Sequence, residues 1–370
     1  MIGAIIVEYN PLHNGHILHI KKTRELMEKI SHSSENYLIA IMSGGFVERG
    51  EVAILNKYTR ATHAICSGVD MVIELPSIFA TSSASYFAKG AIDIARKIKG
   101  LEMICFGSEC GDIEKLKNII NISESKEYNS LVKENMDKGL SYPISTALAL
   151  ESLGIRDNTE YSLPNNTLGI EYIKEAKKVG LEDIMYTIKR EGGGYHDITT
   201  QSEYISATAI RHSVSNNSIE KIENKLPSYV LKDLFNSHID YDKLFGIVTS
   251  KVLTLDNVYE DNEGVINRIK KFSQIANNYE ELISLSHTKR YTKSKIKRIL
   301  LHIALNHSKD MIREIGNINI LAIKESSKHL LSLIEKSEDN YHIENDNYSN
   351  KIYNIVSKDK ITSESMRIIK

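Results

Sequence analysis

The chain has 370 residues, of which 41% are hydrophobic and 26% are charged. This composition is typical of a globular protein with a substantial core, so it excludes disorder over most of the length and favours two domains. The 47 Lys and Arg residues and the 48 Asp and Glu residues leave a net charge of -1, which argues against coating of nucleic acid by bulk charge. A polyanionic partner would therefore have to contact a local basic patch.

The expected location of the protein is the cytosol. Its first residues show neither a basic leader nor a small-residue cleavage site, and no apolar run approaches the roughly 18 residues that cross a bilayer. Its 3 cysteines, Cys66, Cys105 and Cys110, lack Cys-x-x-Cys spacing and fit neither a disulfide framework nor a structural zinc site. We expect no membrane span and no dedicated metal site.

The first half of the chain has the pattern of an α/β protein. Short runs rich in Ile and Val alternate with segments of helical period, as in a Rossmann-like parallel sheet with helices on its faces. The predicted strands are residues 2–7, 37–42, 71–75, 103–106 and 184–189, with a helical insertion at about 113–160. Each strand ends in a polar or glycine-bearing loop, and the carboxyl ends of such strands are where ligands bind.

The second half has a different character. Beyond residue 215, segments such as 243–255 and 265–285 show apolar spacing near 3.6 and few strand signals. We therefore predict a sheet domain over residues 1–215 and a mostly helical domain over residues 216–370. The last thirty residues are rich in Asn, Ser, Lys and Glu, which predicts a frayed helix or a loop.

The most informative motif follows the first predicted strand, at residues 8–16. His13 and His16, three residues apart, would lie on one face of the first turn of the next helix. A helix N-terminus with unpaired backbone N–H groups and two imidazole donors suits the phosphates of a nucleoside triphosphate, and Gly15 would let them approach the backbone. The alternative is a pair of ordinary loop histidines.

A second motif, residues 205–211, lies late in the predicted sheet domain. Ser206 is a good N-cap, Thr208 offers a hydroxyl in the first turn, and Arg211 has a planar fork for the same anion. Two helix N-termini would then face each other across one triphosphate. The alternative is a capped helix with a surface arginine.

Weaker candidates occupy three other loops. Gly107 ends a strand and would admit an adenine ring, unless it is only a turn glycine. Asn165 and Asn166 precede a helix, so one of them is its cap and the other a base or ribose contact. Arg190 ends a strand and is either a phosphate or carboxylate clamp or a solvated charge.

A basic segment interrupts the near-neutral charge of the helical domain. No acidic residue lies between Glu281 and Asp310. The cations and the aromatic residue considered for nucleic-acid binding are Lys289, Arg290, Tyr291, Lys293, Lys295, Lys297 and Arg298. Cations around an aromatic ring match a phosphate backbone and a base that can stack, so we predict a nucleic-acid contact here. The alternative is a solvated helix face.

These motifs resemble a known family. Residues 13–16 with residues 205–211 are similar to the HxGH nucleotidylyltransferase superfamily. The fuller strings at residues 7–16, 106–109 and 289–292 resemble the bacterial tRNA(Met) cytidine acetate ligases, and the similarity runs in order from residue 2 to about residue 300. Gly45, Glu48 and Ala207 depart from the residues expected in these families.

The resemblance implies an enzyme that uses ATP and acetate to form N4-acetylcytidine at the wobble position of elongator tRNA(Met). Acetyl-adenylate is the implied intermediate, and Mg²⁺ would bridge the phosphates. Family ATP contacts would map to Val7, Glu8, Tyr9, Asn10, Pro11, His13, Asn14, Gly15, His16, Gly107, Arg190 and either Asn165 or Asn166. His13 and His16 would stabilise the charge of the departing pyrophosphate.

Two questions stay open at this point. The small pocket that acetate requires has one cation, which we expect among Arg49, Lys57 and Arg60. The leading rival function is a small-molecule nucleotidylyltransferase, which needs no basic segment, and a third hypothesis is a nucleotide-sensing RNA-binding protein without turnover.

Overall fold

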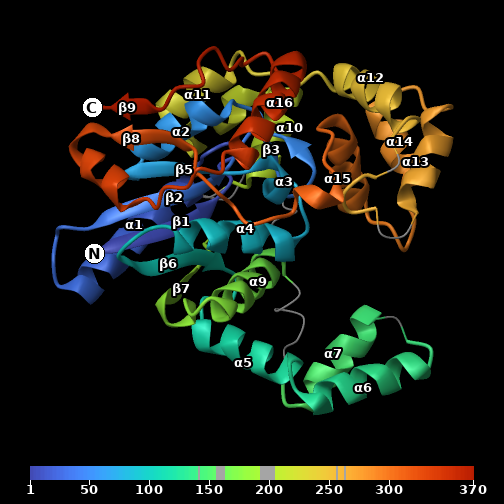
Figure 1. The fold of residues 1–370 in the computed structure, drawn as a ribbon, viewed down its shortest axis with the longest axis horizontal. Coiled ribbons are helices and arrows are strands. Elements are labelled where there is room, and N and C mark those ends of the chain that lie inside the picture. The colour runs from blue at the N-terminus through green and yellow to red at the C-terminus, as the bar shows by residue number, and fades with distance from the viewer. Residues whose placement is uncertain (141, 156–162, 192–204, 256, 262–263) are drawn as a thin grey trace.

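The fold is built on a seven-stranded sheet of order β7-β6-β1-β2-β5-β8-β9 (Figure 1). A computed structural model describes residues 1–140, 142–155, 163–191, 205–255, 257–261 and 264–370. The sheet strands are β1 (Ile2–Val7), β2 (Tyr37–Ser43), β5 (Met71–Leu75), β6 (Leu101–Ser108), β7 (Met185–Lys189), β8 (Ile320–Lys324) and β9 (Arg367–Ile369). The strands predicted from sequence are all present, with ends shifted by at most two residues. The predicted α/β class is confirmed.

Alternation along the strands fills both faces of the sheet. In β1, Ala4 and Ile6 join one core cluster, whereas Ile5 and Val7 join the other. Helices in the first half of the chain that pack near the sheet are α1 (Asn14–Ser31), α2 (Lys57–Cys66), α3 (Ser77–Ala80), α4 (Ala84–Arg96) and α9 (Pro164–Lys178). Helices α1 and α2 pack into the cluster of Ile5 and Val7, and α4 and α9 pack into the cluster of Ala4 and Ile6. Both faces of the sheet are therefore covered, as a buried parallel sheet requires.

The strand order explains where a ligand can bind. From β1 the chain proceeds to β2 and β5 on one side, then crosses to β6 and β7 on the other. The order of the strands thus reverses between β1 and β6, and such a switch point leaves a crevice at the carboxyl ends of the strands. Residues after Val7 and near Gly107 border this crevice.

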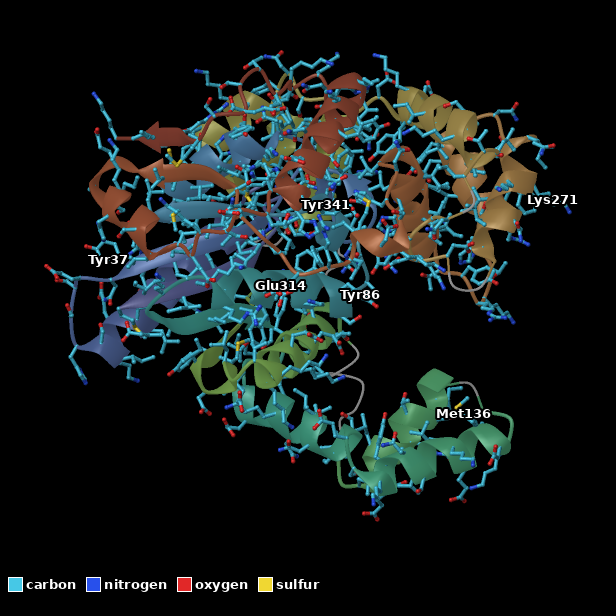
Figure 2. All side chains as sticks on the ribbon, viewed as in Figure 1. Tyr37, Tyr86, Met136, Lys271, Glu314 and Tyr341 are labelled. Atoms are coloured by element: carbon cyan, nitrogen blue, oxygen red, sulfur yellow. The ribbon has the colours of Figure 1, made fainter. Side chains whose placement is uncertain are left out.

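Helices between residues 113 and 152 lead away from the body of the molecule: the first packs against α9, and the later ones project (Figure 1). They are α5 (Ile113–Ser123), α6 (Lys126–Asp137) and α7 (Tyr142–Ser152). Tyr128, Val132 and Ala149 form a small core of their own, while Met136 is exposed on the projecting part (Figure 2).

The second half of the chain is largely helical, as predicted. Its helices are α10 (Ala207–Ser215), α11 (Ser228–Leu234), α12 (Tyr241–Val252), α13 (Val265–Ser273), α14 (Tyr279–Ser286), α15 (Lys293–Ala304) and α16 (Tyr341–Val356). Strand β8 nevertheless pairs antiparallel with β5, and β9 extends the same sheet. The division at residue 215 stays a prediction, because the sheet takes strands from both sides of it. Within the described ranges, no helix has the length and apolarity to cross a membrane.

The prediction for the tail was wrong. Instead of a frayed helix or loop, residues 341–369 contain the sixteen-residue helix α16 and strand β9. Tyr353 of α16 is fully buried and donates a hydrogen bond to the Ala53 carbonyl at 3.0 Å. The tail is held by contacts with residues about 300 positions away, which its polar composition does not reveal.

Helix α15 lies unusually close to a small hairpin, β3 (Phe46–Val47) and β4 (Glu51–Val52). Gly50, in the hairpin turn, has a φ of +74°, and a Cβ there would lie 2.4 Å from the backbone nitrogen of Arg298. Backbone atoms cannot rotate away as a side chain can. The absence of a side chain at Gly50 therefore allows α15 to pack against the hairpin.

Gly50→Ala is expected to destabilise the protein more than Gly180→Ala. Gly180 has a similar φ of +71° but nothing within 4 Å of an added Cβ, so it isolates the conformational cost of about 1–2 kcal/mol. Gly50→Ala adds a clash, which typically costs a further ~1–3 kcal/mol. Denaturant unfolding of both variants measures the difference; equal free energies of unfolding would contradict the close packing.

Candidate functional site

A pocket of about 730 Å³ occupies the crevice at the carboxyl ends of β1 and β6. The sequence-predicted residues that line it are Val7, Glu8, Tyr9, Asn10, His13, Gly15, His16, Gly107, Asn165, Arg190, Ser206 and Arg211. They come from β1, β6 and the amino ends of α1, α9 and α10, which are far apart in the sequence. Parallel strands and the helices that follow them bring these segments together.

His13 and His16 cap helix α1 with their ring nitrogens. The Nδ1 of His13 accepts a hydrogen bond from the Gly15 N–H at 3.1 Å, and the Nδ1 of His16 accepts from the His13 N–H at 3.3 Å. This is a capping box in which imidazoles replace the usual hydroxyl and carboxylate. The rings stack with centroids 3.7 Å apart.

These hydrogen bonds determine the chemistry of the two rings. Because each Nδ1 accepts, the neutral ring carries its hydrogen on Nε2, which is then a donor. Burial, with Arg190 and Arg211 nearby, lowers the pKa of His13 to about 3, and burial likewise holds the pKa of His16 well below its ordinary value. Both rings are therefore neutral donors near pH 7. Neutral donors can stabilise negative charge as it develops.

Helix α10 contributes a second amino end to the pocket. Ser206 is its N-cap, as predicted, and accepts from the Ala209 N–H at 3.1 Å. Arg211 donates to the Asn10 carbonyl at 2.8 Å and to the Glu51 carboxylate at 2.6 Å. The guanidinium thus links the loop after β1, the hairpin and α10 around one pocket.

Asn165 and Asn166 have different surroundings. Asn166 is fully buried, and its Oδ1 accepts from the Glu109 and Cys110 N–H groups at 2.9 and 3.2 Å. Asn165 lines the pocket, and its Oδ1 accepts from Arg190 at 3.3 Å. Neither asparagine is the N-cap of α9: the carboxylate of Glu109 accepts from the N–H groups of both, at 3.2 and 2.7 Å.

Several residues that were predicted to contact ATP lie outside the pocket or use their side chains elsewhere. Pro11, Asn14, Asn166 and Thr208 do not line the pocket. The Asn166 side chain is used by the β6 loop, as above, and Thr208 Oγ1 accepts from Arg211 at 3.4 Å. Asn10 borders the pocket, but its Oδ1 accepts from the Ile54 N–H at 2.8 Å. Its side-chain oxygen therefore holds a loop in place.

The three candidates for the cation of the acetate pocket also have different surroundings. Lys57 is buried in an ion pair with Glu74 at 2.7 Å. Arg60 is fully buried and donates to backbone carbonyls, including those of Glu8 at 2.6 Å and Ser43 at 3.1 Å. Only Arg49, among these three, lines the pocket.

Sequence reasoning missed part of the lining. Lys22 continues the three-residue spacing of His13, His16 and His19, which was a usable signal. Thr292 and Ser294, at the amino end of α15, also line the pocket. Nothing in the sequence indicated that α15 lies so near the histidines, because its contact depends on the hairpin at Gly50.

The basic segment divides into two groups. Lys297 pairs with Glu51 at 3.4 Å and Arg298 with Glu260 at 2.8 Å, so these two cations serve internal ion pairs. The other members are partly or fully exposed: Lys289, Arg290, Tyr291, Lys293 and Lys295. The nucleic-acid contact predicted for the segment is therefore narrowed to residues 289–295, beside the pocket.

Comparisons with known proteins agree with this geometry. A model of the HIGH Nucleotidyl Transferase family matches residues 1–368. A protein of Caldanaerobacter subterraneus subsp. tengcongensis named tRNA(Met) cytidine acetate ligase is 38% identical over 349 residues, covering 90% of this chain and 86% of the relative. The Clostridium novyi protein of the same name is 42% identical over 315 residues, covering 81% and 77%.

A solved structure extends the similarity to the whole fold. The crystal structure of Thermotoga maritima TmcAL bound with alpha-thio ATP matches with a TM-score of 0.85 and 27% sequence identity, covering 100% of both chains. The apo form of the same protein gives a TM-score of 0.87 at 26% identity.

Asn166→Ala is expected to destabilise the fold far more than Asn165→Ala. The first change leaves two backbone donors, of Glu109 and Cys110, without their acceptor, at about 1–3 kcal/mol for each donor that stays buried. Asn165→Ala removes a pocket side chain and is a matched control at the next position. Thermal or denaturant unfolding measures both; an equally stable Asn166→Ala protein would contradict the assignment.

Proposed function

This chain belongs to the HIGH Nucleotidyl Transferase family and, within it, to the tRNA(Met) cytidine acetate ligases, and from that membership we propose the reaction that its pocket carries out. The enzyme uses ATP to activate acetate and transfers the acetyl group to the wobble cytidine of elongator tRNA(Met), giving N4-acetylcytidine. One observation in particular supports the first step: two neutral imidazoles with Nε2 donors at the amino end of α1. The substrates imply a cytosolic location.

The first step is the activation of acetate. An acetate oxygen attacks the α-phosphorus of ATP in line with the departing pyrophosphate, which leaves acetyl-adenylate. The Nε2–H groups of His13 and His16, at the positive end of the α1 dipole, donate to the phosphate oxygens as charge builds on them. Ser206 and Arg211 border the opposite side, where α10 presents a second amino end.

Further proposed contacts follow from the lining of the pocket. Asn165, Gly107 and Arg190 border the nucleoside side, next to β6 and α9. Arg49 is the proposed cation for the acetate carboxylate. We propose that Mg²⁺ enters with ATP on its phosphate oxygens; the described residues include no cluster of three or more His, Cys, Asp or Glu side chains suited to a metal ion.

The second step joins the acetyl group to tRNA. The N4 amine of cytidine attacks the carbonyl carbon of the mixed anhydride and AMP leaves. The basic segment 289–295 includes Thr292 and Ser294, which line the pocket. A tRNA bound to this segment would therefore have its anticodon near the adenylate. A cation beside an aromatic ring, such as Arg290 with its guanidinium 5.7 Å from the Tyr291 ring centroid, suits a stacked base and its phosphate.

One assay separates this function from the small-molecule nucleotidylyltransferase. The protein is incubated with ATP, radiolabelled acetate and bulk tRNA. Label in RNA together with release of AMP supports the ligase. Transfer of a nucleotide to a phosphorylated metabolite, without label in RNA, would establish the rival.

His16→Asn is expected to reduce acetate-dependent release of pyrophosphate by about 10²–10³-fold. The Asn oxygen can still accept from the His13 N–H, so the cap is kept while the Nε2 donor is lost. His32→Asn, at the exposed carboxyl end of the same helix, is the control. Unchanged pyrophosphate release in His16→Asn would exclude this histidine from the activation step.

The double variant Lys289→Ala/Arg290→Ala is expected to weaken tRNA binding and to lower the slope of log affinity against log salt by roughly 1–2. Lys177→Ala/Lys178→Ala removes the same charge from exposed positions at the end of α9 and should leave the slope unchanged. Filter binding across a salt series measures both. Equal slopes in the two double variants would contradict a tRNA contact at residues 289–290.

A further inference from the structure

The acetyl transfer needs a group that accepts a proton. When the N4 amine forms its bond to the acetyl carbon and the bond from that carbon to the phosphate oxygen of AMP breaks, one N–H proton must leave the nitrogen. His13 and His16 are poor acceptors, because each Nδ1 already accepts a backbone N–H and each Nε2 carries its hydrogen. The acceptor must therefore be sought among the other pocket residues.

The carboxylates that line the pocket differ in their partners. Glu51 is shared by Arg211 and Lys297, Glu191 pairs with Lys22, and Glu48 pairs with Arg298 at 3.8 Å. Within the described part of the chain, the Glu8 carboxylate has one hydrogen-bond partner, the Glu48 N–H, which donates to its Oε1 at 2.8 Å. Its Oε2 is therefore available for a proton, whereas the oxygens of Glu51 and Glu191 face cations.

Hydrogen bonds fix both the backbone and the carboxylate of Glu8. It directly follows β1, and its backbone carbonyl accepts a hydrogen bond at 2.6 Å from Arg60, whose side chain is fully buried. The Glu48 N–H fixes its carboxylate on the pocket side of the β3–β4 hairpin. A carboxylate held in this way is preorganised, which is what proton transfer in a transition state requires.

We propose that Glu8 is the general base of the acetyl transfer, taking the N4 proton of cytidine onto its free carboxylate oxygen as the amine attacks acetyl-adenylate. This inference rests on the proposed function. The step is balanced: the amine and acetyl-adenylate give the amide and AMP, and the released proton resides on Glu8 until solvent removes it. Activation of acetate does not need this base, since no proton leaves acetate, which is already a carboxylate.

The surroundings of Glu8 suit a base that works near neutrality. Burial and, less strongly, the nearby Glu48 carboxylate raise the pKa of its carboxyl, while the Glu48 N–H and the Arg49 and Arg211 guanidinium groups lower it, and the net pKa is about 7. The titratable and charged groups that face Glu8 are Arg49, Glu48, Arg60, Tyr172 and Arg211. Below about pH 7 the carboxyl is protonated and cannot accept. The transfer rate should therefore rise with pH through about 7 and then level off.

Glu8→Gln tests the proposal, because the amide oxygen can still accept from the Glu48 N–H while the base is lost. The two steps are measured separately, as acetate-dependent exchange of pyrophosphate into ATP and as single-turnover transfer of acetyl from preformed acetyl-adenylate to tRNA(Met). We expect transfer to fall by about 10²–10⁴-fold, and exchange to fall far less, because Glu8 bears on the first step only as a residue that lines the ATP pocket. Glu8→Asp should restore part of the transfer and its rise with pH.

Glu102→Gln is the matched control, because Glu102 likewise accepts from a backbone N–H, that of Ile2 at 3.1 Å, but at the other end of the sheet. Three outcomes would overturn the inference: unchanged transfer in Glu8→Gln, an equal loss of exchange and transfer, or loss of transfer in Glu48→Gln but not in Glu8→Gln. If the wild-type protein does not acetylate tRNA, the proposed function itself fails, so the two failures are distinguishable.

Discussion

The reciprocal hydrogen bonds between the α1 backbone and the rings of His13 and His16 are the interaction on which the site depends. A helix N-terminus leaves backbone donors unpaired, and here two of them are satisfied by imidazole Nδ1 atoms. The same bonds leave the hydrogen of each neutral ring on Nε2 and stack the rings 3.7 Å apart. The same two hydrogen bonds therefore cap the helix and set which ring nitrogen is the donor. They lie at the switch point between β1 and β6, where the strand order leaves a crevice.

A second constraint joins this crevice to the helical half of the chain. Glu51 in the small hairpin contacts Arg211 of α10 and Lys297 of α15, while Gly50 lets the α15 backbone approach. The ion pairs are partly buried, so removing one partner would leave a charge poorly compensated. The hairpin thus holds the amino end of α15 at the pocket, which brings the basic residues before that helix close to the histidines.

The sequence predicted those parts of the molecule that depend on local pattern. The five parallel strands follow from apolar runs, and the histidine motif follows from its place after the first of them. The features that the sequence did not predict depend mostly on contacts between residues far apart in the chain. Glu109 caps α9 from 56 residues away, β9 has only 3 residues, and Lys297 and Arg298 have carboxylate partners on other elements. Strand β8 was missed although its Ile320–Ile323 run is apolar. A sequence motif predicts the local structure of its own segment, whereas burial and ion pairing depend on contacts that form only in the folded chain.

Burial also explains why the pocket combines neutral histidines with fixed guanidinium groups. If His13 and His16 were cationic, they would hold the phosphates of ATP and the released pyrophosphate about equally well, and uniform binding of that kind does not speed the reaction. Desolvation, aided by Arg190, keeps both rings uncharged. In the proposed reaction, their donors then gain strength mainly as charge moves onto the leaving oxygens. In the proposed reaction, the guanidinium groups of Arg190 and Arg211 supply the permanent positive charge that attracts the polyanion, because guanidinium groups keep their protons near pH 7 whereas the buried imidazoles do not.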